Sequence, residues 1–260
     1  MMHTPIFSTS TLLLLLLIHT LPLCAQDAQQ QDGFEEPVKE LNFMESVYNQ
    51  EKKEFQLSLF GNHFERGGLH MYNLRYEVEY GVTQRLQAEV SLLNTRARPL
   101  ETAMDHQSFY LLEGGLLYNL IDTRRFAAVV SMVGLFPLNE KKSMPEGEED
   151  VNVYQYTPHL VLATQLGRLQ LHLDNGLEFR GADREYFSNL GAILPLGDFV
   201  PMLELLCSYE DETEVFLGPG LAWSGLESFN IIAGSTFDLN RNSKQWGVNL
   251  AFIYEFKAGQ

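Results

Sequence analysis

Positive charge and cysteine are scarce in this sequence. Its 260 residues hold 18 Lys and Arg against 34 Asp and Glu, a formal net charge of −16. Because phosphate backbones are bound by clustered cations, this balance argues against nucleic acid as a partner. There are 2 cysteines, of which Cys24 falls within the leader described next. Cys207 alone can form no disulfide framework, zinc cluster or redox pair.

Long apolar runs are also missing from most of the chain. After residue 25, no segment has the ~18 consecutive apolar residues that a spanning helix needs. A short aliphatic run at 12–18 is followed by Leu23-Cys24-Ala25, and this pattern predicts a secretory signal peptide over residues 1–25. The Leu-Pro-Leu-Cys at 21–24 also hints at a lipoprotein box, although the bulky Leu23 argues against it, so lipidation of Cys24 stays open.

The segment that follows the signal has no clear period. Residues 26–33 are rich in Gln and Asp and read as a spacer, and residues 38–48 carry apolar side chains at mixed spacing. Both a short helix and a structureless entry are compatible with that spacing. We therefore expect a periplasmic entry segment over residues 26–52.

From residue 53 onward, apolar and polar residues alternate, which is the pattern of strands with two different faces. In the last such stretch, Trp246, Val248 and Leu250 share one face with Phe252, while the other face begins at Gly247. The alternation predicts twelve strands, at 53–64, 69–81, 85–95, 108–120, 125–137, 152–165, 169–180, 184–196, 199–210, 213–224, 227–239 and 245–256. Residues 257–260 form a C-terminal tail.

An apolar face could border either lipid or the core of a soluble β-sandwich. Short turns alternate with longer connections, as in a barrel whose two ends face different compartments. Along the apolar face we expect no Asp, Glu, Lys or Arg, and we expect aromatic residues at the strand ends around an aliphatic middle. The expected membrane girdle is Tyr72, Tyr80, Tyr118, Tyr154, Tyr156, Trp223, Phe237, Trp246, Tyr254 and Phe256. The predicted fold is therefore all-β: a single antiparallel transmembrane β-barrel over residues 53–256 in the outer membrane of a Gram-negative bacterium.

Several motifs resemble one group of outer-membrane barrels. The stretch Glu-Tyr-Gly-Val-Thr-Gln-Arg-Leu-Gln-Ala-Glu at 79–89 resembles the strand–turn–strand of barrels grouped as MetA-pathway phenol-degradation or transporter-like proteins. The motifs at 201–205 and 217–221 are similar to later strands of that group, and 41–55 to its entry segment. The resemblance implies a barrel spoken of as a transporter, with no defined substrate.

The polar face of the strands should line the lumen. Its predicted members are Arg75, Glu77, Glu79, Glu89, Glu113, His159, His172, Asp174, Glu178, Arg180, Glu204, Asp238 and Glu255. Acids outnumber bases, so an open lumen would favour cations or hydroxyl-rich solutes. The alternative is a narrow barrel filled by hydrogen-bonded side chains, with a structural or assembly role in the envelope.

Catalysis and metal chemistry have little support. His172 and Asp174 share a face and could suit a metal, but a satisfied internal hydrogen bond is the simpler interpretation. His70 and Asn94 have the outward parity of a lipid-modifying barrel enzyme, yet the sequence has no Gly-x-Ser-x-Gly motif. We therefore expect no enzyme, no cofactor and no metal. The expected partners are outer-membrane lipid, the barrel-assembly machinery and a small solute.

Overall fold

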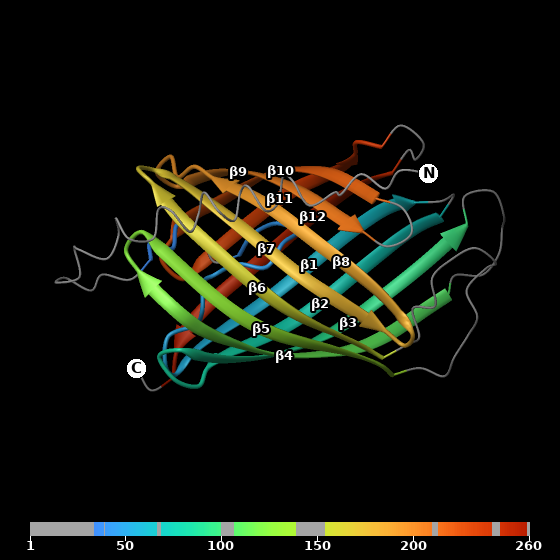
Figure 1. The fold of residues 1–260 in the computed structure, drawn as a ribbon, viewed down its shortest axis with the longest axis horizontal. Coiled ribbons are helices and arrows are strands. Elements are labelled where there is room, and N and C mark those ends of the chain that lie inside the picture. Colours follow the sequence, from blue (N-terminus) through green and yellow to red (C-terminus); the bar gives the residue numbers. More distant parts are fainter. Residues whose placement is uncertain are drawn as a thin grey trace, which may run out of the picture.

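The computed structural model describes residues 34–38, 40–66, 69–99, 107–138, 154–209, 213–240 and 245–258. Within these ranges, twelve strands form one closed antiparallel barrel, without any helix (Figure 1). The predicted fold class is thereby confirmed. The described part of the chain contains no helix long and apolar enough to cross a bilayer.

Each strand pairs with the next one along the chain. The strands are β1 (Glu54–Arg66), β2 (Leu69–Gly81), β3 (Leu86–Pro99), β4 (Gln107–Thr123), β5 (Phe126–Pro137), β6 (Gln155–Leu166), β7 (Leu169–Arg180), β8 (Asp183–Ile193), β9 (Phe199–Tyr209), β10 (Thr213–Leu226), β11 (Phe229–Asp238) and β12 (Trp246–Lys257). β12 pairs back onto β1, from Glu54 opposite Lys257 to Glu65 opposite Trp246. A free strand edge in lipid would expose unpaired backbone groups, and closure of the barrel leaves no such edge.

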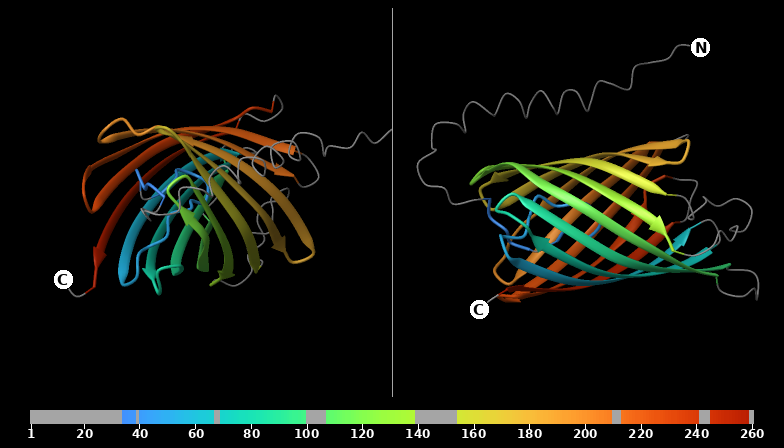
Figure 2. Two further views of the ribbon diagram at one scale, coloured as in Figure 1. Left: turned by 60° about the vertical axis from the view of Figure 1, so that its left-hand side comes forward. Right: turned by 90° about the horizontal axis from the view of Figure 1, so that it is seen from below.

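The barrel has two unlike ends. One end, here called the turn end, holds the connections at 82–85, 124–125, 167–168, 194–198 and 227–228. The opposite end is called the loop end. The C-terminus lies at the turn end (Figures 1 and 2). Alternation of long and short connections is incomplete, because β7 and β8 are joined at the loop end by residues 181–182 alone.

Some strand boundaries differ from those predicted. β3 continues four residues beyond the predicted end at 95, because its pairing with β2 persists to Leu69 opposite Pro99. β8 stops at Ile193 instead of 196. Pro195 follows closely, and a proline has no N–H for the ladder.

The barrel wall presents an apolar surface to the outside. β12 shows this most clearly, because exposed and buried residues alternate strictly from Trp246 to Glu255. Large apolar side chains stay exposed in the middle of other strands, for example Leu116 at 55%, Met132 at 49% and Leu221 at 45%. A continuous exposed apolar belt of this kind fits a hydrocarbon environment and not water.

The belt departs from the expected aliphatic middle at two positions. Tyr76, opposite Leu59 and Leu92, is 52% exposed, and Phe252 lies opposite the same Leu59 on β12. Aromatic rings thus also occur between the two girdles, where hydrocarbon accepts an apolar ring.

Charge is not fully excluded from the outer face either. Arg96 and Arg98 are exposed opposite Tyr72 and His70, and Arg184 is exposed with its guanidinium 5.7 Å from the Phe179 ring centroid. All three lie near the loop end, where long cationic side chains can reach the headgroup layer. The expectation of an outer face without charge was therefore wrong at this end.

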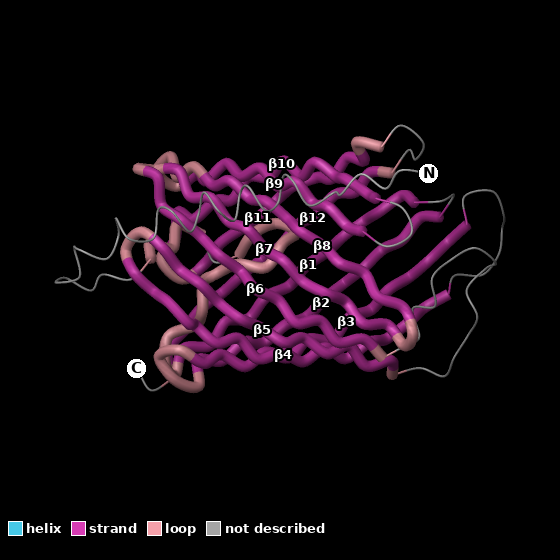
Figure 3. The backbone as a smooth tube through the Cα atoms, in the orientation of Figure 1, coloured by secondary structure: helices cyan, strands magenta, loops and turns pink. Residues whose placement is uncertain are grey.

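A segment outside the strands runs inside the barrel. Residues 34–38 and 40–50, which we call the lumen segment, are drawn as an irregular tube within the ring of strands (Figure 3). Val38, Leu41, Met44, Val47 and Tyr48 are buried against inward-facing side chains near the turn end. The wall residues of this core include Leu117, Val129, Val161, Ile193, Ile232 and Ile253. Residues 26–52 were expected as a periplasmic entry; the part of them in the lumen segment lies inside the barrel, and 26–33 fall outside the described residues.

Candidate functional site: the lumen

The lumen segment is fixed to the barrel wall by side chains that point inward. The Glu204 carboxylate on β9 accepts the backbone N–H of Asn42 at 2.7 Å and that of Phe43 at 2.9 Å. Three strands further round the barrel, Asn249 Nδ2 on β12 donates to the backbone oxygen of Asn42 at 3.0 Å and to its Oδ1 at 2.8 Å. Bonds to a carboxylate are stronger than neutral ones. Glu204 and Asn249 therefore hold the middle of the segment from two places on the wall.

The C-terminal part of the segment has its own polar anchors. The Tyr48 hydroxyl bonds to Gln170 Oε1 and lies 3.3 Å from His172 Nε2. The Gln50 N–H donates to Gln87 Oε1 at 2.7 Å. None of these bonds belongs to a strand ladder, so the segment could leave the lumen without opening the barrel wall.

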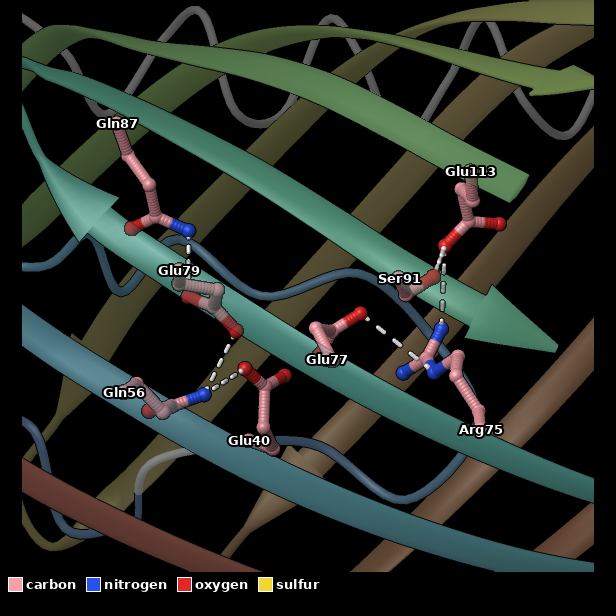
Figure 4. Close-up of polar contacts among 8 residues, drawn as sticks. All are labelled: Glu40, Gln56, Arg75, Glu77, Glu79, Gln87, Ser91 and Glu113. Carbon is pink, nitrogen blue, oxygen red and sulfur yellow. Dashed lines mark hydrogen bonds and ion pairs between the residues drawn. The ribbon is translucent and has the colours of Figure 1, made fainter.

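Beside the segment, carboxylates gather on the β1–β4 side of the lumen (Figure 4). Carboxylate oxygens of Glu40, Glu77 and Glu79 lie within 4.8 Å of one another, and Glu40 comes from the lumen segment. Gln56 Nε2 joins the segment to the wall, since it donates to Glu40 at 2.9 Å and to Glu79 at 2.7 Å. Within the described residues, this is the group of three possible metal ligands whose ligand atoms lie this close to one another.

Compensating positive charge in this sector comes from Arg75. Its guanidinium lies 3.5 Å from Glu77 and 3.7 Å from Glu113 (Figure 4). The same group lies 4.0 Å from the Phe60 ring centroid. Ser91 donates to Glu113 at 2.9 Å. One guanidinium is shared by several carboxylates, so the sector keeps an excess of acid.

Glu40 and Glu45 on the lumen segment titrate abnormally because of burial and this crowding. The pKa of Glu40 is raised from 4.5 to about 7, chiefly by burial and then by the nearby Glu77 carboxylate, against smaller opposing effects of Gln56 and Arg75. Burial, followed by the charge of Glu89, raises the pKa of Glu45 well above its ordinary value. Close carboxylates disfavour the ionised form of one another.

Above the segment, a cavity of about 540 Å³ extends toward the loop end. The segment itself forms one boundary, from Glu40 to Tyr48. Side chains such as Phe64, Gln155 and Glu185 line it close to the loop end. The lumen therefore has two parts: an apolar core packed around the segment at the turn end, and a polar chamber beyond it.

The predicted lumen residues occupy different parts of this arrangement. Arg75, Glu77, Glu79, Glu89, Glu113, His159, Asp174 and Glu178 line the chamber. Glu178 pairs with Arg180 at 2.5 Å. Asp238 accepts from the Asn240 N–H near the loop end, and Glu255 is buried opposite Gln56 near the turn end.

His172 and Asp174 do not act together. His172 faces Tyr48 and Gln170, whereas Asp174 lies 3.1 Å from His159 Nδ1. The two residues, whose spacing could have suited a shared metal ion, therefore belong to two separate hydrogen-bonded groups.

The outward residues considered for lipid chemistry are also separated. His70 lies opposite Arg98, and Asn94 lies opposite Leu74, four residues along β2. At about 3.4 Å per residue, this spacing keeps the two side chains apart. The ring nitrogen that lies close to His70 belongs to His63.

The expected girdle residues lie on the outer wall in two groups. Tyr72, Tyr154, Tyr156, Phe237 and Trp246 lie toward the loop end, and Tyr80, Tyr118, Trp223, Tyr254 and Phe256 toward the turn end. Several rings stack across strands, for example Tyr156 on Phe179 at 4.6 Å.

Sequence reasoning missed the contribution of residues 34–50. Glu40, Asn42 and Glu45 were not among the candidates, because the parity argument applies only to strands. A signal was present nonetheless: polar residues occur between apolar ones in a stretch too short and irregular to build a core of its own.

Comparison with known proteins supports the fold alone. No family model matches the chain, and no curated protein matches it. Among solved structures, it is similar to the outer membrane channel from Pseudomonas putida F1, with 12% identity, a TM-score of 0.60, and coverage of 81% of this chain and 98% of that one. It is also similar to the KdgM porin (11% identity, TM-score 0.56, 76% and 99% covered). The NanC porin matches comparably (10% identity, TM-score 0.57, 76% and 98% covered).

These neighbours share the closed barrel at very low identity. The chain thus has the fold of outer-membrane β-barrel channels. Its resemblance to the MetA-pathway group stays a prediction.

Proposed function

We propose that this chain is an outer-membrane channel for small solutes, closed in the described state by its own lumen segment. The proposal rests on how the lumen is closed. A polar chamber ends on a segment that takes no part in the barrel ladder and is held by side-chain contacts at Glu204, Asn249 and Gln170.

The solutes would be cations or neutral, hydroxyl-rich molecules. Glu77, Glu79, Glu89 and Glu113 face the chamber beside a single Arg75 on the same side. Fixed negative charge in a confined path concentrates cations and repels acids. One neighbour in the comparison is described as the KdgM porin in complex with disordered oligogalacturonate, an acidic ligand. The acidic wall of this chain predicts a different preference.

Location and partners follow from the same proposal. The exposed apolar belt and its two aromatic groups suit outer-membrane lipid, and insertion would use the barrel-assembly machinery, with Tyr254 and Phe256 near the chain end. A signal peptide over residues 1–25, which lie outside the described residues, would direct export.

The competing function is a structural barrel with a permanently filled lumen. It is favoured by the apolar core around Leu41, Met44 and Val47, which would oppose displacement of the segment.

Single-channel recording in planar bilayers separates the two proposals. The mature chain is compared with a variant that lacks residues 34–50. A channel predicts rare openings of the mature chain and steady, cation-selective openings of the deletion variant. Silence of both proteins, with the heat-dependent gel mobility of a folded barrel preserved, would instead support the structural function.

A further inference from the structure

Two imidazole rings face each other on the outer wall near the loop end. His63 on β1 and His70 on β2 stack with ring centroids 5.4 Å apart, and His63 Nε2 lies 3.3 Å from His70 Nδ1. Both side chains belong to the outward parity of their strands, together with Leu57 and Tyr72. The pair lies outside the lumen, so the proposed transport function does not involve it.

The separation of the two nitrogens matches the bite of a metal ion. Zinc bonds imidazole nitrogen at ~2.0–2.1 Å, so two ligands at a tetrahedral angle have nitrogens about 3.3–3.4 Å apart. In the metal-free pair, one ring donates its proton into the space between the nitrogens. If that proton moves to the other nitrogen of its own ring, both lone pairs face the space between the rings, and a modest rotation of the rings lets them meet at one ion. No net proton is released.

A carboxylate lies beside the histidine pair. Glu65 is directly opposite His70 in the β1–β2 register and two residues from His63 on the same face of β1. Its Oε2 accepts a hydrogen bond from Trp246 Nε1 at 3.0 Å. This bond holds the carboxylate toward β12, and Glu65 does not come close enough to both imidazoles to be a third ligand.

Neighbouring rings hold His63 in place. Tyr72 lies 4.6 Å from it and Trp246 lies edge-on at 5.2 Å. Other described histidines have different surroundings: His159 faces a carboxylate of Asp174, and His172 is buried against Tyr48. The outer pair is distinguished by two imidazole nitrogens that face each other at a half-buried position on the outer wall.

From this geometry, we propose that His63 and His70 form a binding site for a divalent transition metal at the outer surface of the barrel. The site takes Zn²⁺ or Cu²⁺, whose preferred ligands are imidazole nitrogens. Water fills the remaining coordination positions. Because β1 and β2 each supply a ligand, a bound ion also links these strands at the loop end.

The test uses the full mature chain in detergent, purified without a histidine tag. Zn²⁺ binding is measured by calorimetry, and Cu²⁺ binding by electron paramagnetic resonance, which reports nitrogen ligands. We expect one site for which His63→Gln or His70→Gln weakens binding by more than about 10-fold, because even partners outside the ligand set are worth 10–100-fold. His159→Gln is the matched control and should leave the affinity unchanged.

Two results would overturn the site. One is a mature chain that binds no Zn²⁺; the other is a double variant, His63→Gln with His70→Gln, that binds as tightly as the native chain. Heat-dependent mobility on gels verifies that each variant is a folded barrel. A Cu²⁺ spectrum without imidazole nitrogen couplings would likewise exclude the proposed ligands.

Discussion

The carboxylate of Glu204 accepts two consecutive backbone N–H groups, from Asn42 and Phe43. A wall residue thereby binds the main chain of the lumen segment, whatever side chains the segment carries. Glu204 is fully buried, and Gly218 lies directly opposite it on β10. Because Gly218 has no side chain, there is room for the Phe43 ring, which would lie 3.3 Å from a Cβ at position 218.

Replacement of Glu204 by Gln should loosen the lumen segment. The variant keeps one carbonyl acceptor but loses the charge, and hydrogen bonds to charged groups contribute about 1.5–3 kcal/mol. A loss of about 1–3 kcal/mol would raise the displaced population by about 5–150-fold. The readout is cleavage within residues 34–50 by a protease added to the folded barrel, together with channel opening.

Asp238→Asn is the control for this substitution. It removes the same charge from a residue that accepts a hydrogen bond from Asn240 near the loop end. If both variants raise cleavage equally, the effect comes from lumen charge in general and Glu204 does not act as a latch.

Substitution of Gly234 by Ala should displace the segment sterically. A Cβ at Gly234 would overlap Asn42 Nδ2, far below contact distance, so Asn42 has to move away from Asn249. Gly61→Ala is the matched control, because the nearest atom to its Cβ is the Leu250 backbone oxygen at 3.9 Å. We expect faster cleavage of the segment in the first variant only, with unchanged barrel mobility on gels. Equal protection in both variants would contradict the close approach of Asn42 to Gly234.

Strand positions and facing could be predicted from the sequence, because the wall separates two solvents. Lipid excludes charge from one face, so alternation such as Tyr72, Leu74 and Tyr76 against Arg75 and Glu77 determines which side faces inward. The lumen segment obeys no such rule. Its apolar residues pack against a curved wall and its polar residues meet Glu204 or Asn249, partners more than 150 residues away in the chain. Contacts of that kind produce no periodic pattern of apolar and polar residues, so the sequence alone does not predict them.

Docking of the lumen segment should weaken as pH rises. The pKa of Glu40 is about 7 when docked against the usual 4.5 when free, so the docked state binds more protons. The contribution of Glu40 to docking is then complete below pH 4.5 and is lost as pH rises through about 7. Charged groups facing it are Glu77 and Arg75 of β2, with Glu79 beside them. Channel openings should become more frequent across this range.

Glu40→Gln checks the assignment of this pH effect. The pH dependence of channel opening reports how many protons the segment binds when it docks, and Glu40→Gln should lower this number by up to about one. Glu51→Gln, at an exposed position, should leave the pH dependence unchanged. An unaltered pH dependence in Glu40→Gln would assign the titration to other carboxylates of the sector.

The two faces of β2 should differ in how far a change of charge affects folding. Leu74 is 37% exposed on the outer wall near the middle of the strand, whereas Glu77 is buried on the inner side, next to Arg75. Leu74→Arg places a cation near the lipid midplane at a cost of ~2–4 kcal/mol, and should reduce the yield of folded barrel in refolding into lipid vesicles. Glu77→Gln removes a charge from a sector with excess acid, so folding should be nearly unchanged while any cation preference falls. The fraction with heat-dependent gel mobility measures both variants on one scale. Equal yields would mean that Leu74 does not face hydrocarbon, and the facing of β2, including the acidic sector built on it, would have to be reversed.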